Sequence, residues 1–292
     1  MTSRRVECER RPAPQRDRVA RTDRKRNEVR GGGGKPIVPR EADITQAIIS
    51  AYHRRLSDRI VGDVVVVGAG PSGLVAATAL ARRQLRVTLL EKRLAPGGGI
   101  WGGAMGMNHV VVQDPALAIL EESGARYHGG GGGLYVTDAV ELASALCLEA
   151  VRCGVALLNL TFVEDLCVHR NRVTGVVANR SMLAENLPID PIALEARAVV
   201  DATGHEAALV NMLVRRNLLD LPAGLPGEGP MDAAVGEAFV VDRVSEVYPG
   251  LWICGMSVVA ALGGPRMGPI FGGMLLSGER AAELIAAALG PS

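Results

Sequence analysis

The sequence predicts a doubly wound α/β fold with a mainly parallel sheet and a small antiparallel β insertion, and three observations carry this prediction. The β-branched run Val64–Val67 is typical of a strand that is buried on both faces of a parallel sheet. Glycines follow this run at G-x-G-x-x-G spacing and open a helix of small residues over 74–83. A second strand over 86–91 ends in an acid, Glu91. Together these elements form a βαβ unit at the start of a parallel sheet.

The glycine turn itself predicts a site for the diphosphate of an adenine dinucleotide. Gly68, Gly70 and Gly73 direct free backbone N–H groups and a helix N-terminus at one point. Glu91 lies eighteen residues after Gly73. In dinucleotide-binding folds, a carboxylate at this position accepts a hydrogen bond from a ribose hydroxyl. A lone glycine motif is weak, but strand, glycines, helix, second strand and acid in this order indicate NAD or FAD.

The remaining elements extend this unit along the chain. Apolar periodicity and β-branched runs predict helices over 43–59, 114–123, 138–153 and 269–289, and strands over 109–112, 134–136, 155–159, 161–169, 172–178, 196–203 and 251–254. Two of the strands are expected to form a hairpin across Asn171. We therefore expect one dinucleotide-binding domain over 37–292, with an antiparallel insertion at about 155–195.

Composition excludes several classes of function. Hydrophobic residues make up 48% of the 292 residues, but aromatic residues only 3%. Surfaces that stack nucleic-acid bases and the aromatic belts of membrane proteins both need more aromatic side chains. No apolar run approaches the roughly 20 residues of a membrane-spanning helix. We expect neither a nucleic-acid partner nor a membrane.

The N-terminal segment differs from the rest of the chain. Residues 1–36 hold twelve Lys or Arg against five Asp or Glu, almost no apolar residues, and the run 31–34 of four glycines. Such a segment cannot bury enough surface to offset its ordering entropy, so we predict a disordered basic tail. The five cysteines show no C-x-x-C spacing, which fits a reducing, cytoplasmic location.

Five motifs together resemble one family, the thiamin thiazole synthases, and in particular its sulfide-dependent branch. They are Glu91-Lys92, the glycine-rich loop 96–103, Asp190-Pro191, the stretch 201–205 and the stretch 264–272. The likeness covers most of residues 40–290. It implies a flavoprotein-like, GR2-type fold and a homo-octamer whose sites are shared between neighbouring subunits.

The resemblance also implies a reaction. Members of the family use NAD as a substrate, release nicotinamide, and combine the remaining ADP-ribose with glycine and sulfur. The product is an ADP-thiazole carboxylate, and the reaction depends on ferrous iron. The expected small-molecule partners are therefore NAD, glycine and sulfide, with Fe(2+) as the metal.

Residue roles follow from the resemblance position by position. Asp190 and His205 match iron ligands, and Arg266 matches the residue that holds the glycine carboxylate; these three form the predicted catalytic set. A carboxylate with an imidazole suits Fe(II), and a guanidinium group suits a carboxylate. Beside Gly68, Gly70 and Gly73, the positions that match NAD contacts are Ser72, Glu91, Lys92, Gly99, Val163, Pro188, Ile189, Asp190 and Met256.

The residues alone leave other interpretations open. Asp190-Pro191 is also an ordinary turn dipeptide, and His205 at a strand end is also typical of a hydrogen-bonded pocket residue. Arg266, among Gly and Pro, would equally close a loop over a phosphate.

One position departs from the family pattern. The residue two before Asp190 is a cysteine in members that surrender their own sulfur and usually a histidine in the sulfide-dependent branch. Here it is Pro188, which has no sulfur and no side-chain lone pair. Sulfur donation through this position is excluded, so any sulfur must come from outside. The alternatives are an FAD-dependent oxidoreductase, a divergent relative that cleaves NAD for another product, and a non-catalytic NAD-binding protein.

Overall fold

The computed structural model describes residues 38–183, 190–221 and 223–290. The chain divides between Asp58 and Arg59 into two compact units. The described part of the first unit holds one helix, α1 (Glu41–Ser57), close to the helix predicted over 43–59. The predicted tail 1–36 lies outside the described residues.

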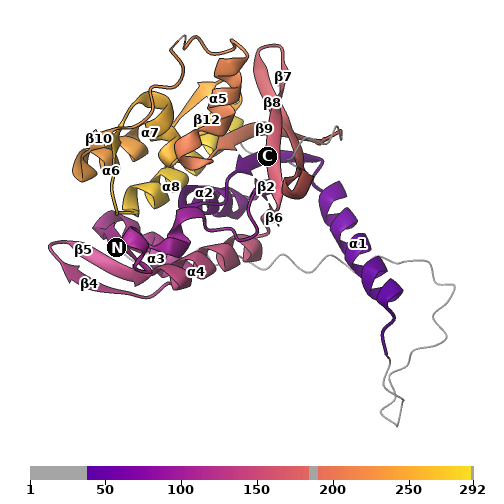
Figure 1. Cartoon of the computed structure of the whole chain (residues 1–292), viewed down its shortest axis with the longest axis horizontal. Helices are drawn as coiled ribbons and strands as arrows, with labels where there is room; N and C mark the ends of the chain where they lie inside the picture. The colour runs from indigo at the N-terminus through magenta and orange to yellow at the C-terminus, as the bar shows by residue number, and fades with distance from the viewer. Residues whose placement is uncertain (1–37, 184–189, 222, 291–292) are drawn as a thin grey trace. The chain divides into compact units, whose positions relative to one another are not determined.

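The second unit is built around an eight-stranded sheet with a parallel centre (Figure 1). Its parallel strands, in spatial order, are β12 (Leu251–Ile253), β9 (Ile192–Asp201), β1 (Val61–Val67), β2 (Val87–Leu90) and β6 (Ala156–Leu158). Val64 lies opposite Val87 on one side and Ala198 on the other. β1 is thus a central strand, as its β-branched run predicted.

Three strands join this sheet in antiparallel orientation. β11 (Ser245–Tyr248) pairs with β12, β8 (Arg172–Arg180) pairs with β9, and β7 (Thr161–His169) pairs with β8. β7 and β8 form the hairpin that the sequence predicts across Asn171, since His169 pairs with Arg172. The predicted α/β fold with a mainly parallel sheet is confirmed.

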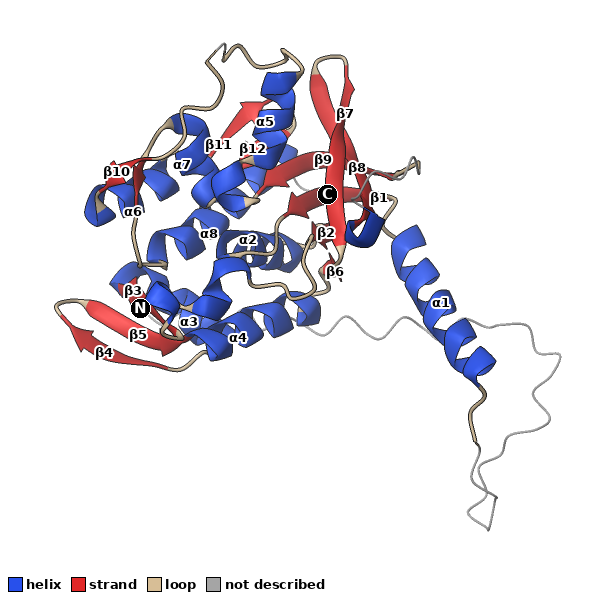
Figure 2. Cartoon of the chain, viewed as in Figure 1, coloured by secondary structure: helices blue, strands red, loops and turns tan. Residues whose placement is uncertain are grey.

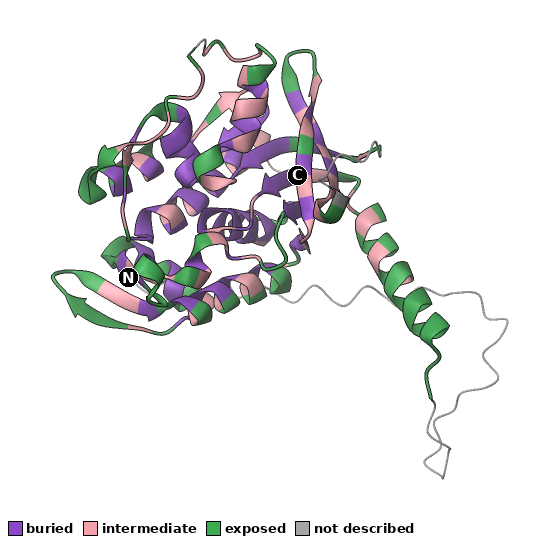
Figure 3. Ribbon diagram, viewed as in Figure 1, coloured by how far each residue is buried: buried purple, intermediate pink, exposed green. Residues whose placement is uncertain are grey.

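Helices complete the unit (Figure 2). They are α2 (Pro71–Arg82), α3 (Leu117–Ser123), α4 (Ala139–Arg152), α5 (Ala208–Arg215), α6 (Ala233–Asp242), α7 (Met256–Leu262) and α8 (Gly272–Leu289). α2 packs against both α8 and α4, and all of α2 except Arg82 is buried. Figure 3 shows this buried core in α2, α8 and the central strands. None of the described helices combines the length and apolar character that crossing a membrane requires.

Smaller elements surround the core. β3 (His109–Gln113), β5 (Leu134–Asp138) and β4 (Tyr127–Gly131) form a separate antiparallel sheet, and β10 (Gly229–Met231) pairs with β13 (Pro265–Arg266). Single helical turns occur at η1 (Gly98–Gly102), η2 (Ala104–Gly106), η3 (Asp114–Ala116), η4 (Ser181–Leu183) and η5 (Gly204–Glu206).

The structure differs from the sequence prediction mainly after β9. α5, α6, α7, β10, β11 and β13 were not predicted, and neither was β4. α7 is buried except for Leu262, so its sequence carries no polar face to reveal a helical period. α5 follows Ala207, which has φ 38° and offers no side-chain cap. The final helix begins at Gly272 and not at Pro269.

Candidate active site

A cavity of about 790 Å³ lies at the carboxyl ends of β1, β2 and β9. Val67, Leu90 and Ala202, at or just beyond these ends, contribute to its wall. Ligands of doubly wound sheets bind at this edge. Most of the residues that the sequence singles out line this one cavity: Gly68, Gly70, Ser72, Glu91, Lys92, Gly99, Val163, His205, Met256 and Arg266.

The glycines of the first turn have two different roles. Gly68 has φ 100°, a conformation that a side chain would strain. A Cβ on Gly73 would lie 1.9 Å from the carbonyl oxygen of Gly68, so Gly73 is required for packing, and it does not line the cavity. Gly70 has nothing within 4 Å of its Cβ position. The turn is closed on its protein side and open at Gly70, where α2 presents its N-terminus.

Glu91 is buried at the end of β2 and is held by backbone groups. It accepts hydrogen bonds from the N–H of Ala69 at 2.9 Å and the N–H of Arg93 at 2.8 Å, one on each oxygen. Each carboxylate oxygen has two lone pairs, so both retain the capacity to accept from a ligand. Glu91 is therefore oriented before any ribose binds.

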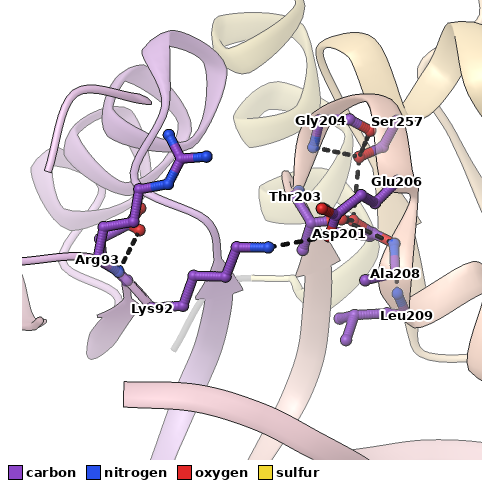
Figure 4. Close-up of polar contacts among 10 residues, drawn as sticks. Lys92, Arg93, Asp201, Thr203, Gly204, Glu206, Ala208, Leu209 and Ser257 are labelled. Carbon is purple, nitrogen blue, oxygen red and sulfur yellow. Dashed lines mark hydrogen bonds and ion pairs between the residues drawn. The ribbon is translucent and has the colours of Figure 1, made fainter. Parts of the chain in front are cut away.

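An ion pair not predicted from the sequence connects two walls of the cavity. Lys92 Nζ, after β2, lies 2.9 Å from a carboxylate oxygen of Glu206 in η5 (Figure 4). Both side chains are at least half exposed, so water screens their attraction.

The turn that carries His205 is fixed by a buried carboxylate, Asp201, at the end of β9 (Figure 4). Asp201 accepts from the N–H and hydroxyl of Thr203 at 3.0 and 2.7 Å, and from the hydroxyl of Ser257 at 3.0 Å. Its second oxygen accepts from the N–H groups of Leu209 and Val210 at 2.8 and 3.1 Å. Asp201 thus ties the strand end to α7 and caps α5, which leaves η5 as a constrained bridge between them.

His205 and Arg266 meet at a second carboxylate, Glu228. His205 Nδ1 is hydrogen-bonded to Glu228 Oε1, and Arg266 Nε lies 3.3 Å from Glu228 Oε2. The side chains of His205 and Arg266 are 67% and 57% exposed, whereas that of Glu228 is 17% exposed. We call these three residues the polar corner. Sequence reasoning missed Glu228, which is a single acid in the irregular stretch 223–228 with no motif around it.

The other predicted metal ligand is not in this cavity. Asp190 is exposed, two residues before β9, and does not line the cavity; Pro188 and Ile189 lie outside the described residues. Over 38–183, 190–221 and 223–290, no three His, Cys, Asp or Glu side chains are grouped to hold a metal ion. The described part of one chain therefore brings a single predicted ligand, His205, to the cavity.

The four cysteines in the described part of the chain do not line the cavity. Burial raises the pKa of Cys254 to about 12 and that of Cys147 to about 11. Both are thus held as thiols, which are poor nucleophiles.

The comparisons with known proteins agree with each other. The Thi4 family model matches residues 45–271. Thiamine thiazole synthase of Pyrococcus horikoshii is 49% identical over 247 residues, which are 84% of this chain and 97% of the relative. The protein of that name from Methanothermobacter thermautotrophicus is 45% identical over 246 residues, 83% of this chain and 95% of the relative. The crystal structure of Thermovibrio ammonificans THI4 has a TM-score of 0.83 at 42% identity, over 86% of this chain and 98% of that one. The chain therefore belongs to the Thi4 family.

Proposed function

We propose that this protein is an enzyme of thiazole biosynthesis that converts NAD, glycine and external sulfide to an ADP-thiazole carboxylate and releases nicotinamide, with Fe(II) as its metal. The names of the curated relatives support thiazole synthesis. One observation supports the finer proposal: a single cavity holds both a dinucleotide cradle and a corner of imidazole, carboxylate and guanidinium groups. An electron carrier needs only the first of these.

The cradle supports the binding of NAD. The turn has open space at Gly70, and the N-terminus of α2 follows it; a helix N-terminus suits a diphosphate because its first N–H groups have no intrahelical partner and its potential is positive. Glu91, already oriented by Ala69 and Arg93, suits ribose hydroxyls. Lys92 would add a positive charge at the cavity wall.

The polar corner supports the binding of glycine. Arg266 contacts Glu228 through Nε, and the two terminal nitrogens of its guanidinium group have no hydrogen-bond partner among the described residues, so they suit a carboxylate. A pair of parallel N–H donors matches the two oxygens of a carboxylate. Arg266 would thereby orient the amino group of glycine within the cavity that holds the dinucleotide.

The donor chemistry at His205 fits a metal ligand. Its Nδ1 is engaged by Glu228, and a histidine that ligates through one nitrogen usually donates its other N–H to a carboxylate. Asp190 does not line the same cavity, so we propose that Asp190 of a neighbouring subunit in an octamer completes the site. When bound, Fe(II) would supply Lewis-acid chemistry and an open position for sulfide.

The sulfur would come from outside the protein. Pro188 stands where self-sacrificing relatives carry cysteine, and the described cysteines do not line the cavity. Because burial raises the pKa of Cys254 to about 12, this side chain is a thiol at neutral pH, and a thiol is a much poorer nucleophile than a thiolate.

An anaerobic assay tests the proposal. The protein is incubated with NAD, glycine, sulfide and Fe(II), and mass spectrometry follows nicotinamide and adenylated thiazole. Both products, in equal amounts and only with all four components, are expected. Nicotinamide without thiazole would indicate the divergent relative, and a yellow protein that leaves NAD intact would indicate an FAD-dependent oxidoreductase.

A further inference from the structure

Glu228 lies between the two side chains that the proposed function assigns to metal and glycine. One of its oxygens is engaged by His205 Nδ1 and the other by Arg266 Nε. Neither the sequence motifs nor the names of the relatives assign it a role. Its two oxygens are thus committed to two different groups of the polar corner.

The backbone makes Glu228 the anchor of this arrangement. Glu228 directly precedes β10, and the N–H of Gly229 donates to the carbonyl of Gly264 at 2.8 Å. Met231 pairs with Arg266 in β13, and the N–H of Asp232 donates to the carbonyl of Arg266 at 3.0 Å. The β10–β13 pair therefore holds Glu228, directly before β10, beside Arg266 in β13, although 37 residues separate them in the sequence.

Burial separates the anchor from the groups it holds. The Glu228 side chain is mostly buried, whereas those of His205 and Arg266 are mostly exposed to the cavity and solvent. An exposed imidazole or guanidinium group samples several rotamers unless a partner restrains it. Glu228 restrains both.

The chemistry of a carboxylate decides how it restrains them. A carboxylate accepts and does not donate, so a neutral His205 carries its proton on Nδ1 and presents the lone pair of Nε2. On the other oxygen, the ion pair with Arg266 Nε restrains the guanidinium group, whose terminal nitrogens have no hydrogen-bond partner among the described residues.

We propose that Glu228 is a positioning residue that sets the tautomer of His205 for metal binding and the plane of Arg266 for carboxylate binding at the same time. This rests on the proposed function. It couples the metal site and the glycine site through one side chain. Loss of Glu228 should weaken both ligands and leave the binding of NAD at the cradle unchanged.

Two substitutions separate the contact of Glu228 with His205 from its contact with Arg266. Glu228→Ala removes both acceptors. Glu228→Gln keeps one acceptor oxygen but turns an NH₂ group toward the other partner, so it can accept from only one of the two side chains. Glu206→Gln is the matched control, because it removes one negative charge from the same cavity without contact to His205 or Arg266 in the described interactions.

The measurements use the full-length protein without turnover. Nitrogen NMR of labelled histidine reports the tautomer of His205 in the metal-free protein, and titration with Co(II) reports metal affinity. We expect Glu228→Ala to lose the Nδ1–H signature and to bind Co(II) about 10- to 100-fold more weakly. Glycine affinity should fall in Glu228→Ala and less in Glu228→Gln, while NAD affinity stays within twofold and Glu206→Gln resembles the wild type.

Several results would overturn the proposal. They are an unchanged His205 tautomer and Co(II) affinity in Glu228→Ala, an equal loss in Glu206→Gln, or a changed absorption spectrum at saturating Co(II), which would make Glu228 a direct ligand. Failure of thiazole synthesis by the wild type would refute the proposed function alone, because the tautomer and Co(II) measurements need no product.

Discussion

The dinucleotide cradle and the polar corner line one cavity but are built in opposite ways. The cradle consists of backbone: a turn around Gly68 and Gly73, closed by the almost wholly buried helix α2. The corner consists of two exposed side chains, on η5 and β13, and the mostly buried Glu228 directly before β10; these elements have only two or three residues. The cradle therefore depends on steric fit, whereas the corner depends on polar partners.

The largest expected effect breaks the cradle. Gly73→Ala would place a Cβ 1.9 Å from the carbonyl oxygen of Gly68 and should lower the free energy of unfolding by on the order of 3 kcal/mol. Gly70→Ala is the matched control, because its Cβ position is free within 4 Å; it should keep stability and lose NAD affinity. Urea unfolding and NAD titration measure the two. Equal stability of both variants would refute the steric account.

The next effect tests the link from the core to the corner. Asp201→Asn would turn an NH₂ group toward N–H donors that bond a charged carboxylate in the wild type. It should lower the free energy of unfolding by about 2–3 kcal/mol. Asp232→Asn serves as the control: Asp232 caps α6 on the surface, where asparagine caps equally well. Urea unfolding should separate the two by at least about 1 kcal/mol. Similar values would mean that Asp201 is not the fixed point of η5.

A smaller effect depends on pH and concerns the core beneath the cavity. Burial raises the pKa of Cys254 from 9.0 to about 12, so the unfolded thiol ionises first. The stability that this gives is complete below about pH 8.5 and is lost as the pH rises towards 12. Between pH 8 and 10 the wild type should lose on the order of 1 kcal/mol more than Cys254→Ala. Parallel urea midpoints of the two proteins over this range would contradict the assignment.

The smallest expected effect concerns the ion pair that joins the two regions. Lys92→Gln and Glu206→Gln should each change the free energy of unfolding by less than about 0.5 kcal/mol, because both side chains are half exposed. NAD affinity should fall several-fold in Lys92→Gln only, since Lys92 is the predicted contact. A large loss of stability in both variants would contradict this expectation and show that the ion pair couples the cradle strongly to the corner.

The same difference explains what the sequence could predict. The cradle rests on local patterns, a β-branched run and spaced glycines, so its strands and helix could be assigned within a few residues. The small antiparallel sheet was assigned only in part, because β4 is glycine-rich and has no apolar alternation. The family resemblance predicted roles for His205 and Arg266 but did not point to Glu228, which contacts both.

Glu228 could not be predicted, for a physical reason. Its role arises from the pairing of β10 with β13, which contain two prolines, one glycine and two other residues in all, and have no strand propensity to detect. Asp201 lay in a recognised motif, but its function as the cap of α5 requires the fold. Contacts between segments far apart in sequence leave no local pattern.

The short ladder between β10 and β13 has a consequence for how the molecule would fail. Its hydrogen bonds hold Glu228 and Arg266 together, and Glu228 in turn holds His205. Local unfolding of this ladder would release both His205 and Arg266 from Glu228 in one event while the cradle stays folded. On the proposed function, such a molecule would still bind NAD but would not cleave it, so partial unfolding would not consume the coenzyme.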